Sequence, residues 1–299
     1  MWPSTNRKKF ITSTVIILSY IIIAAFILVP IFFMVITTFK YENEVANRPF
    51  TIIPKSSFVP INWLYIFGLA ELKPELGYQW VRPGSHLDIG KTLITSLIIA
   101  SITVLVTLTS GSLAAYQLSR GRITAGKEGI FIGLLILKMI PTIIMVLPLY
   151  LIFKQMGLLD TMPSLIFPYS ALQIPVAIWV LRGFIEKIPK EIEESAALDG
   201  ASRISIYLRI MLPLIRPALG AVAVYSFLGA FGEFLYATTF TASQARTFTV
   251  TISEFAREDN MTYTILCVVG TISIIPGTIV AVLFNKLLVR GLTAGAVKG

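Results

Sequence analysis

The chain has 299 residues, a formal net charge of +9 and a mean hydropathy of +0.79. Only 14% of its residues are charged and 55% are hydrophobic, whereas about 25% of residues are charged in a typical soluble domain. This composition excludes a water-soluble globule and predicts an all-α integral membrane protein. A single cysteine, Cys267, and a single histidine, His86, also exclude a disulfide framework and a zinc site.

Six apolar segments are long enough to cross a bilayer, which takes about 20 residues of helix. They lie at residues 10–39, 92–119, 129–153, 161–181, 217–245 and 261–285. The first is too long for a signal-peptide core and has no small-residue cleavage site, so we expect it to remain as a membrane anchor. The sequence therefore predicts six transmembrane helices with a cytoplasmic helix between the fourth and the fifth.

The distribution of Lys and Arg predicts which side of the membrane each connecting segment faces. If both termini are cytoplasmic, the inner segments carry 15 basic and 6 acidic residues, and the outer segments carry 9 of each. Because basic residues near span ends stay on the cytoplasmic side, this arrangement fits the positive-inside rule. The basic charge therefore indicates topology and gives no argument for nucleic-acid binding.

The segment between the second and third spans, GRITAGKE at 121–128, comes within one residue of a nucleotide-binding loop. Glu128 stands where a Ser or Thr hydroxyl should coordinate Mg²⁺, and the pattern also requires a preceding strand. A second near match, GSHLDIGKT at 84–92, has one residue too many between its glycines. Neither motif predicts ATP binding. The chain also lacks G-x-S-x-G and H-E-x-x-H motifs, so we expect a non-catalytic membrane protein.

A long outer segment, residues 41–90, is rich in proline and aromatic residues. We expect part of it to rest at the membrane interface, where Trp and Tyr are favoured, and the rest to be available to a partner. A second outer segment, residues 241–260, connects the last two spans.

The inner segment at 187–213 carries the most specific pattern in the chain. Pro189 suits a first helical turn, acidic residues follow it, and Gly200 can close the helix with a left-handed residue. These features predict a short helix, a turn and a second helix that leads to Pro213. The small side chains at 195–197 would let another backbone approach closely. The alternative is an amphipathic helix that lies passively on the membrane surface.

This segment resembles a motif of permease subunits in binding-protein-dependent ATP-binding-cassette importers, E-A-A-x-x-x-G followed after nine residues by I-x-L-P. The positions concerned are Glu194, Ser195, Ala196, Ala197, Gly200, Ile210, Leu212 and Pro213, with Ser195 in place of the first motif alanine and Ala197 at a spacer position. In that family the segment forms a coupling helix that sits in a groove of the ATPase subunit. The stretches LAAYQLSRGRITAGKEG and GLTAGAVKG are similar to the carbohydrate-transporting branch of the family.

The resemblance implies a permease subunit that moves a carbohydrate, with an oligosaccharide expected, from an extracytoplasmic binding protein into the cytoplasm by alternating access. It implies a second permease subunit and an ATPase dimer as partners, with MgATP bound by the ATPases and no cofactor bound by this chain. It also implies a multi-pass protein of the bacterial or archaeal cytoplasmic (inner) membrane with both termini cytoplasmic. Residues 1–9 would be the N-terminus, 10–290 the permease domain and 291–299 a tail that is ordered only between partner subunits. The alternative is an ion-coupled secondary transporter or a channel.

Within the outer segment 241–260, the resemblance implies that Gln244 and Thr247 belong to a loop that contacts the binding protein. The alternative is a connector that lies on the membrane surface.

Two charges, Lys138 and Glu233, fall inside predicted spans, where an unpaired charge costs at least about 2.5–3.5 kcal/mol. Both are candidates for the substrate pathway. One interpretation is an ion pair between the third and fifth spans. A second is that Lys138 faces the translocation cavity and favours an acidic saccharide, and a third is that it meets backbone carbonyls or the partner permease.

Overall fold

The computed structural model describes residues 4–46, 51–55, 58, 60–78, 89–121, 126–256 and 262–296. These residues form helices and turns without a strand, which confirms the all-α prediction for the described part of the chain. The elements are α1 (Ser4–Thr37), α2 (Glu42–Ala46), α3 (Ile61–Ile66), η1 (Pro74–Leu76), α4 (Ile89–Arg120), α5 (Lys127–Lys138), α6 (Thr142–Gln155), α7 (Pro163–Ile185), α8 (Glu191–Leu198), α9 (Arg203–Ile206), η2 (Tyr207–Met211), α10 (Leu212–Leu214), α11 (Arg216–Phe231), α12 (Leu235–Phe240), α13 (Phe248–Phe255) and α14 (Tyr263–Ala296). His86 and most of the GSHLDIGKT motif lie outside the described residues.

Four described helices are long and apolar enough to cross a membrane: Thr12–Thr37 of α1, α4, α7 and Tyr263–Phe284 of α14. Two bent pairs, α5 with α6 and the 203–214 segment with α11, raise the number to six if each pair is one span.

The third predicted span is not a straight helix, contrary to our expectation. Helices α5 and α6 are bent by 93° at residues 139–141. Pro141 has an extended backbone (ψ 129°), and proline both lacks an N–H donor and restricts the residue before it. The chain therefore changes direction directly after Lys138, the last residue of α5.

The fifth predicted span, residues 217–245, is also interrupted. Helix α11 ends at Phe231 and the short α12 begins at Leu235, so that Glu233 lies in the break between them. Both charges that the sequence places inside spans thus lie at helix ends, where backbone groups are free to compensate them.

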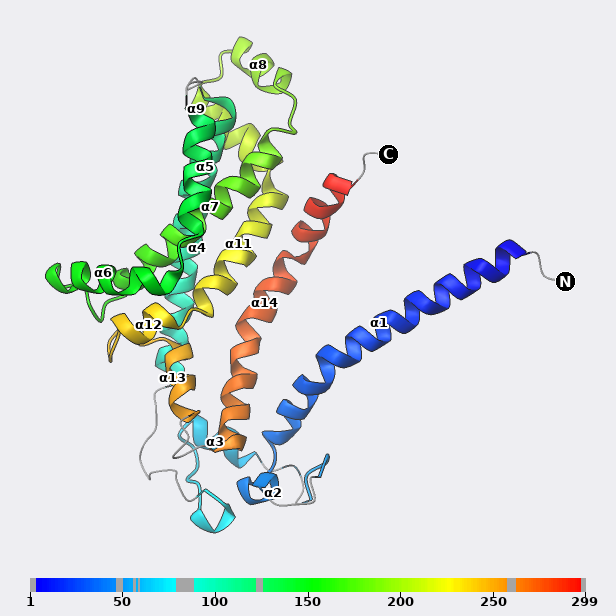
Figure 1. The fold of residues 1–299 in the computed structure, drawn as a ribbon, viewed down its shortest axis with the longest axis vertical. Coiled ribbons are helices and arrows are strands. Elements are labelled where there is room, and N and C mark those ends of the chain that lie inside the picture. The colour runs from blue at the N-terminus through cyan, green and yellow to red at the C-terminus, as the bar shows by residue number, and fades with distance from the viewer. Residues whose placement is uncertain are drawn as a thin grey trace. The chain divides into compact units, whose positions relative to one another are not determined.

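The described residues divide into two compact units, one made of Met1–Leu87 with Ile252–Ser273 and the other of Asp88–Thr251 with Ile274–Gly299. The core of the second unit is formed by α4, α7 and α11, which run alongside one another (Figure 1). Small buried residues, Ala115, Ala177 and Ala218, allow these helices to pack closely, as is common in membranes. Helix α8 lies beyond one end of this bundle and α12 near the other (Figure 1).

A Gly111→Leu substitution should separate α4 from α7. A Cβ atom on residue 111 would lie 2.8 Å from the Cβ atom of Ala177, closer than real Cβ contacts, so the helices must move apart. We expect a loss of about 1–3 kcal/mol in unfolding free energy, measured by thermal unfolding of the detergent-solubilised protein. Gly129→Leu is the matched control, because nothing lies within 4 Å of a Cβ atom there. Equal melting temperatures for the two variants would contradict this packing.

In the first unit, the described part of residues 41–78 is folded by polar contacts. Asn62 donates its amide N–H groups to the carbonyl oxygens of Thr38 and Lys40, at 2.9 and 2.7 Å. Tyr78 donates to Asn62 Oδ1 at 2.7 Å. The Glu42 carboxylate accepts from the backbone N–H groups of Tyr263 and Thr264, both at 2.9 Å, and so caps the first turn of α14.

The expected C-terminal tail, residues 291–299, begins within a helix, and its ordering between partner subunits stays a prediction. Helix α14 continues to Ala296, so residues 291–296 are helical, and 297–299 lie outside the described residues.

Candidate functional site

The segment after α7 has the helix–turn–helix form that the sequence predicts. Helix α8 ends at Leu198, and Gly200 follows it with φ +85°, a left-handed conformation that favours glycine. Ser202 then caps α9 by accepting from the N–H of Ser205 at 3.3 Å. We call residues 190–213 the coupling segment.

The coupling segment has large apolar side chains that no described residue covers. Leu198 is 89% exposed and Ile204 is 71% exposed. Glu194, Ser195 and Ala197 are also exposed, whereas Ala196 is half-buried. Exposed apolar side chains that form one patch can mark a surface that receives another protein.

The opposite face of α8 is fixed to the rest of the unit by a nearly buried ion pair. Arg120 Nε, in the last turn of α4, lies 2.6 Å from Glu193 Oε1, and the two side chains are 8% and 13% exposed. Arg120 also donates to the carbonyl oxygen of Ile185, the last residue of α7, at 3.0 Å, and to that of Ile188, which follows the helix. Tyr116 donates to Glu193 Oε2 at 2.9 Å. This set of contacts, which we call the Arg120 clamp, joins α4, α7 and α8.

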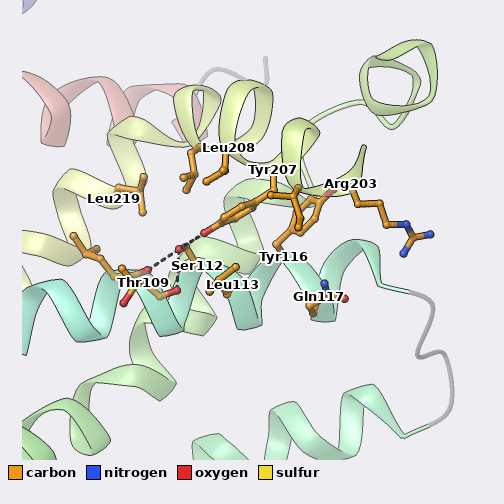
Figure 2. A pocket seen from close by; sticks show the side chains of 12 residues that line it. Thr109, Ser112, Leu113, Tyr116, Gln117, Arg203, Tyr207, Leu208 and Leu219 are labelled. Carbon is orange, nitrogen blue, oxygen red and sulfur yellow. Dashed lines mark hydrogen bonds between the residues drawn. The ribbon is translucent and has the colours of Figure 1, made fainter. Parts of the chain in front are cut away.

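A second contact joins α4 to the other half of the coupling segment. The hydroxyl groups of Ser112 and Tyr207 are 2.7 Å apart, and Figure 2 shows the Tyr207 ring beside that of Tyr116. These residues line a cavity of about 540 Å³ between α4 and the 203–219 region, with Leu113, Leu208 and Leu219 among its apolar walls (Figure 2).

The last three motif residues lie where the coupling segment meets α11. Ile210, Leu212 and Pro213 are half-buried, and their neighbours Met211 and Ile215 are 0% and 1% exposed. The 203–214 helix turns by 76° into α11 at this point. A buried, bent joint of this kind can pass a displacement of the exposed helix to a membrane helix.

Sequence reasoning missed Arg120, Glu193, Tyr116 and Tyr207. Of these four residues, only Arg120 stands out in the sequence, because it is a charged residue directly after a long apolar segment. Nothing in the sequence indicates that Glu193, 73 residues later, is its partner.

The interpretation of Lys138 and Glu233 as an ion pair is wrong. The salt bridges of the described residues join Arg120 to Glu193 and Arg182 to Glu128 and Glu186, and do not include Lys138 or Glu233. The Glu233 carboxylate instead accepts from the backbone N–H groups of Tyr236 and Ala237, at 3.0 and 3.3 Å. It therefore caps α12, where the helix dipole favours a negative charge.

Lys138 and Glu233 nevertheless line the same cavity, which has a volume of about 400 Å³. The cavity lies between the end of α5, α7 and α11. Its other walls are Tyr169, Leu172, Gln173, Tyr225, Leu228 and Gly229. The two candidates for the substrate pathway thus line one cavity but do not form an ion pair with each other.

Two connecting segments are held together by Asp160, which sequence reasoning also missed. This residue has φ +58°, a conformation that Asp tolerates better than most residues. Its carboxylate accepts from the backbone N–H groups of residues 242–245, at 2.9–3.2 Å. Burial of the carboxylate raises its pKa, but these four donors outweigh that effect and hold the pKa of Asp160 well below its usual range.

The candidates for a binding-protein contact differ in accessibility. Gln244 is exposed on the turn that Asp160 holds. Thr247 is 4% exposed and its hydroxyl lies 2.9 Å from that of Thr249, so it does not project from the loop. Residues 248–255 form α13, and residues 257–260 lie outside the described part of the chain.

The near match to a nucleotide-binding loop has a structural explanation. Gly126, with φ +77°, precedes α5, and Glu128 in the first turn of α5 binds the Arg182 guanidinium through both carboxylate oxygens, at 2.5 and 3.1 Å. The described residues before it belong to helix α4 and not to a strand. Residues 122–125 lie outside the described residues.

These features define a multi-pass α-helical membrane protein with an exposed helix clamped beyond one end of its helix bundle. Residues 108–294 match the family of binding-protein-dependent transport system inner membrane components, and the chain belongs to this family. The match covers the coupling segment, the Arg120 clamp and both charges of the 400 Å³ cavity.

Two relatives illustrate the similarity in sequence. The trehalose/maltose transport system permease protein MalG of Thermococcus litoralis is 37% identical over 254 residues, which are 80% of this chain and 91% of that protein. The trehalose transport system permease protein SugB of Mycobacterium tuberculosis is 35% identical over 264 residues, which are 83% of this chain and 95% of that protein.

The fold is also found in a solved structure. A chain of a bacterial ABC transporter involved in the import of the acidic polysaccharide alginate aligns with a TM-score of 0.70 and 17% identity, over 96% of this chain and 99% of that one. These matches are to transporter permeases, and they give no support to an ion-coupled transporter.

Proposed function

We propose that the chain is a permease subunit of an ATP-binding-cassette importer that moves a carbohydrate into the cytoplasm. Family membership and relatives that are permeases for trehalose and maltose support the class of substrate. The observation that carries the proposal is the coupling segment, an exposed helix whose other face is held to two long membrane helices by the Arg120 clamp.

In this proposal the coupling segment docks on an ATPase subunit. A dimer of such ATPases binds and hydrolyses MgATP, and this chain binds no cofactor. A second permease completes the pathway, and an extracytoplasmic binding protein delivers the sugar. Both termini are cytoplasmic, which places the coupling segment inside and the Asp160 turn outside. Closure of the ATPases then moves α8, and the clamp passes that movement to α4 and α7.

The test uses the exposed part of the coupling segment. Gly200→Pro should abolish uptake without loss of membrane insertion, because proline fixes φ near −65° and removes the N–H that Gly200 donates to Ala197 O at 3.1 Å. Glu194→Lys should weaken docking by reversing an exposed charge. We expect uptake to fall at least about tenfold in each, as a loss of about 1.4 kcal/mol in coupling would produce.

Gly200→Asn is the matched control. Nothing lies within 4 Å of a Cβ atom at residue 200, and Asn tolerates a positive φ, so this variant should retain most of its uptake. The measurement is uptake of labelled trehalose or maltose in cells with equal membrane levels of each variant. Normal uptake by Gly200→Pro and Glu194→Lys would support the alternative of a passive surface helix.

A further inference from the structure

The 400 Å³ cavity between α5, α7 and α11 holds an unusual set of polar groups for the middle of a membrane protein. We propose that it is a substrate-contacting site in this subunit, and that it selects a saccharide carrying a negatively charged substituent. This inference rests on the proposed function as a carbohydrate permease.

The first argument is that Lys138 keeps its charge available. Within the described residues it has no hydrogen-bond or ion-pair partner, and the Glu233 carboxylate of the same cavity accepts from the N–H groups of Tyr236 and Ala237. Lys138 is the last residue of α5, where the helix dipole stabilises a cation without neutralising it. The break after α5 therefore places an ammonium group at the cavity wall.

The second argument is an unsatisfied acceptor in the same wall. Gln173 is 4% exposed, and its amide N–H donates to Ser226 O at 2.9 Å, which fixes the orientation of the amide. Its Oε1 atom is buried and has no partner in the structure. Buried polar groups are normally hydrogen-bonded, so an oriented, unpartnered oxygen at a cavity indicates a ligand that donates. A sugar hydroxyl is such a donor.

The third argument is the shape and chemistry of the remaining surface. Tyr169 and Tyr225 are aromatic residues of the cavity wall, and Leu172 and Leu228 are apolar. Gly229 keeps the space open beside Gln173, since a Cβ atom there would lie 3.2 Å from the Gln173 amide nitrogen. Flat apolar walls with a few polar groups suit a sugar ring, and the ammonium group adds preference for an anionic substituent.

The test compares two probes that differ in one charge, a uronate-containing disaccharide and its methyl ester, on the purified complete importer. Binding is measured as the rise in melting temperature with probe concentration. The original complex should bind the uronate about tenfold more tightly than the ester, as expected for a charge-assisted hydrogen bond. Lys138→Gln should lose this difference and Lys138→Arg should keep it. Lys154→Gln, at an exposed lysine in the last turn of α6, is the control and should leave it unchanged.

A second variant separates the two polar groups of the site. Gln173→Leu should weaken both probes by a similar factor, because Gln173 accepts from a hydroxyl that both probes share. Equal affinity of the original complex for the two probes, no binding of either, or an unchanged preference in Lys138→Gln would overturn the inference. The proposed function would survive those results if the complex still imported a neutral saccharide, whereas an assembled complex that imports no saccharide would overturn the function itself.

Discussion

An Arg120→Ala variant should reach the membrane but lose coupled transport almost completely. Its guanidinium is the counter-charge of Glu193 and also binds the carbonyl oxygen of the last residue of α7. Without it, a nearly buried carboxylate is left unpaired, which costs about 3–5 kcal/mol. That is enough to release the 8-residue helix α8 from the bundle. We expect sugar-stimulated ATP hydrolysis and uptake to fall by at least about a hundredfold.

The clamp can be separated from a general loss of folding by a double-mutant cycle. Glu193→Ala should be nearly as defective as Arg120→Ala, and the double variant should insert better than Arg120→Ala because no unpaired charge remains. Glu191→Ala removes an exposed carboxylate from the same helix and should transport normally. Normal coupling in Arg120→Ala, at normal membrane levels, would show that the clamp does not transmit movement.

The second large effect is expected at Asp160. Asp160→Ala removes a carboxylate that accepts four backbone N–H groups and places alanine at φ +58°, which it disfavours. We expect a loss of about 1.5–3 kcal/mol in unfolding free energy. Asp160→Asn tolerates the same backbone conformation but has no charge, so it isolates the electrostatic part.

The pH dependence of this contact has a definite sign. The pKa of Asp160 is lower in the folded protein than in the unfolded chain, so its stabilisation is fully present above the unfolded value of about 3.9. It is lost as the pH falls below that value towards the folded pKa. The difference in melting temperature between the original protein and Asp160→Asn should therefore shrink as the pH falls from about 6 to 3. A constant difference over this range would contradict the assignment.

Local sequence patterns predicted the coupling segment well. Its left-handed glycine and its second helix depend on residues that are neighbours in the chain, and their chemistry acts over one or two turns. Its first helix begins at Glu191, so Pro189 precedes the helix and does not lie in its first turn as expected. The all-helical class followed from the apolar composition. A long apolar segment in lipid has no water to bind its backbone N–H and C=O groups, so it forms a helix in which these groups bind one another.

The helix breaks and the long-range contacts were not predictable in this way. Hydropathy gives no information about the direction of the chain. The apolar residues on both sides of Pro141 were therefore predicted as one span, although the chain bends there by 93°. The ion-pair interpretation of Lys138 failed because it ignored the free N–H groups that a second break offers to Glu233. Arg120 and Asp160 each bind a residue more than 70 positions away in the chain. The periodicity of apolar residues in the sequence gives no information about such contacts.

The cap that Glu42 places on α14 has a consequence for the order in which the protein is made. The carboxylate and the N–H group of Tyr263 are 221 residues apart in the chain. A ribosome makes the N-terminal residues first. The Glu42 carboxylate therefore has no Tyr263 N–H group to bind until most of the chain has been synthesised. The contacts of the first unit therefore close only after the start of α14 has been made, because residues 252–273 belong to that unit. A chain that stops before α14 leaves the Glu42 carboxylate without the donors of Tyr263 and Thr264 and the contacts of its first unit unfinished.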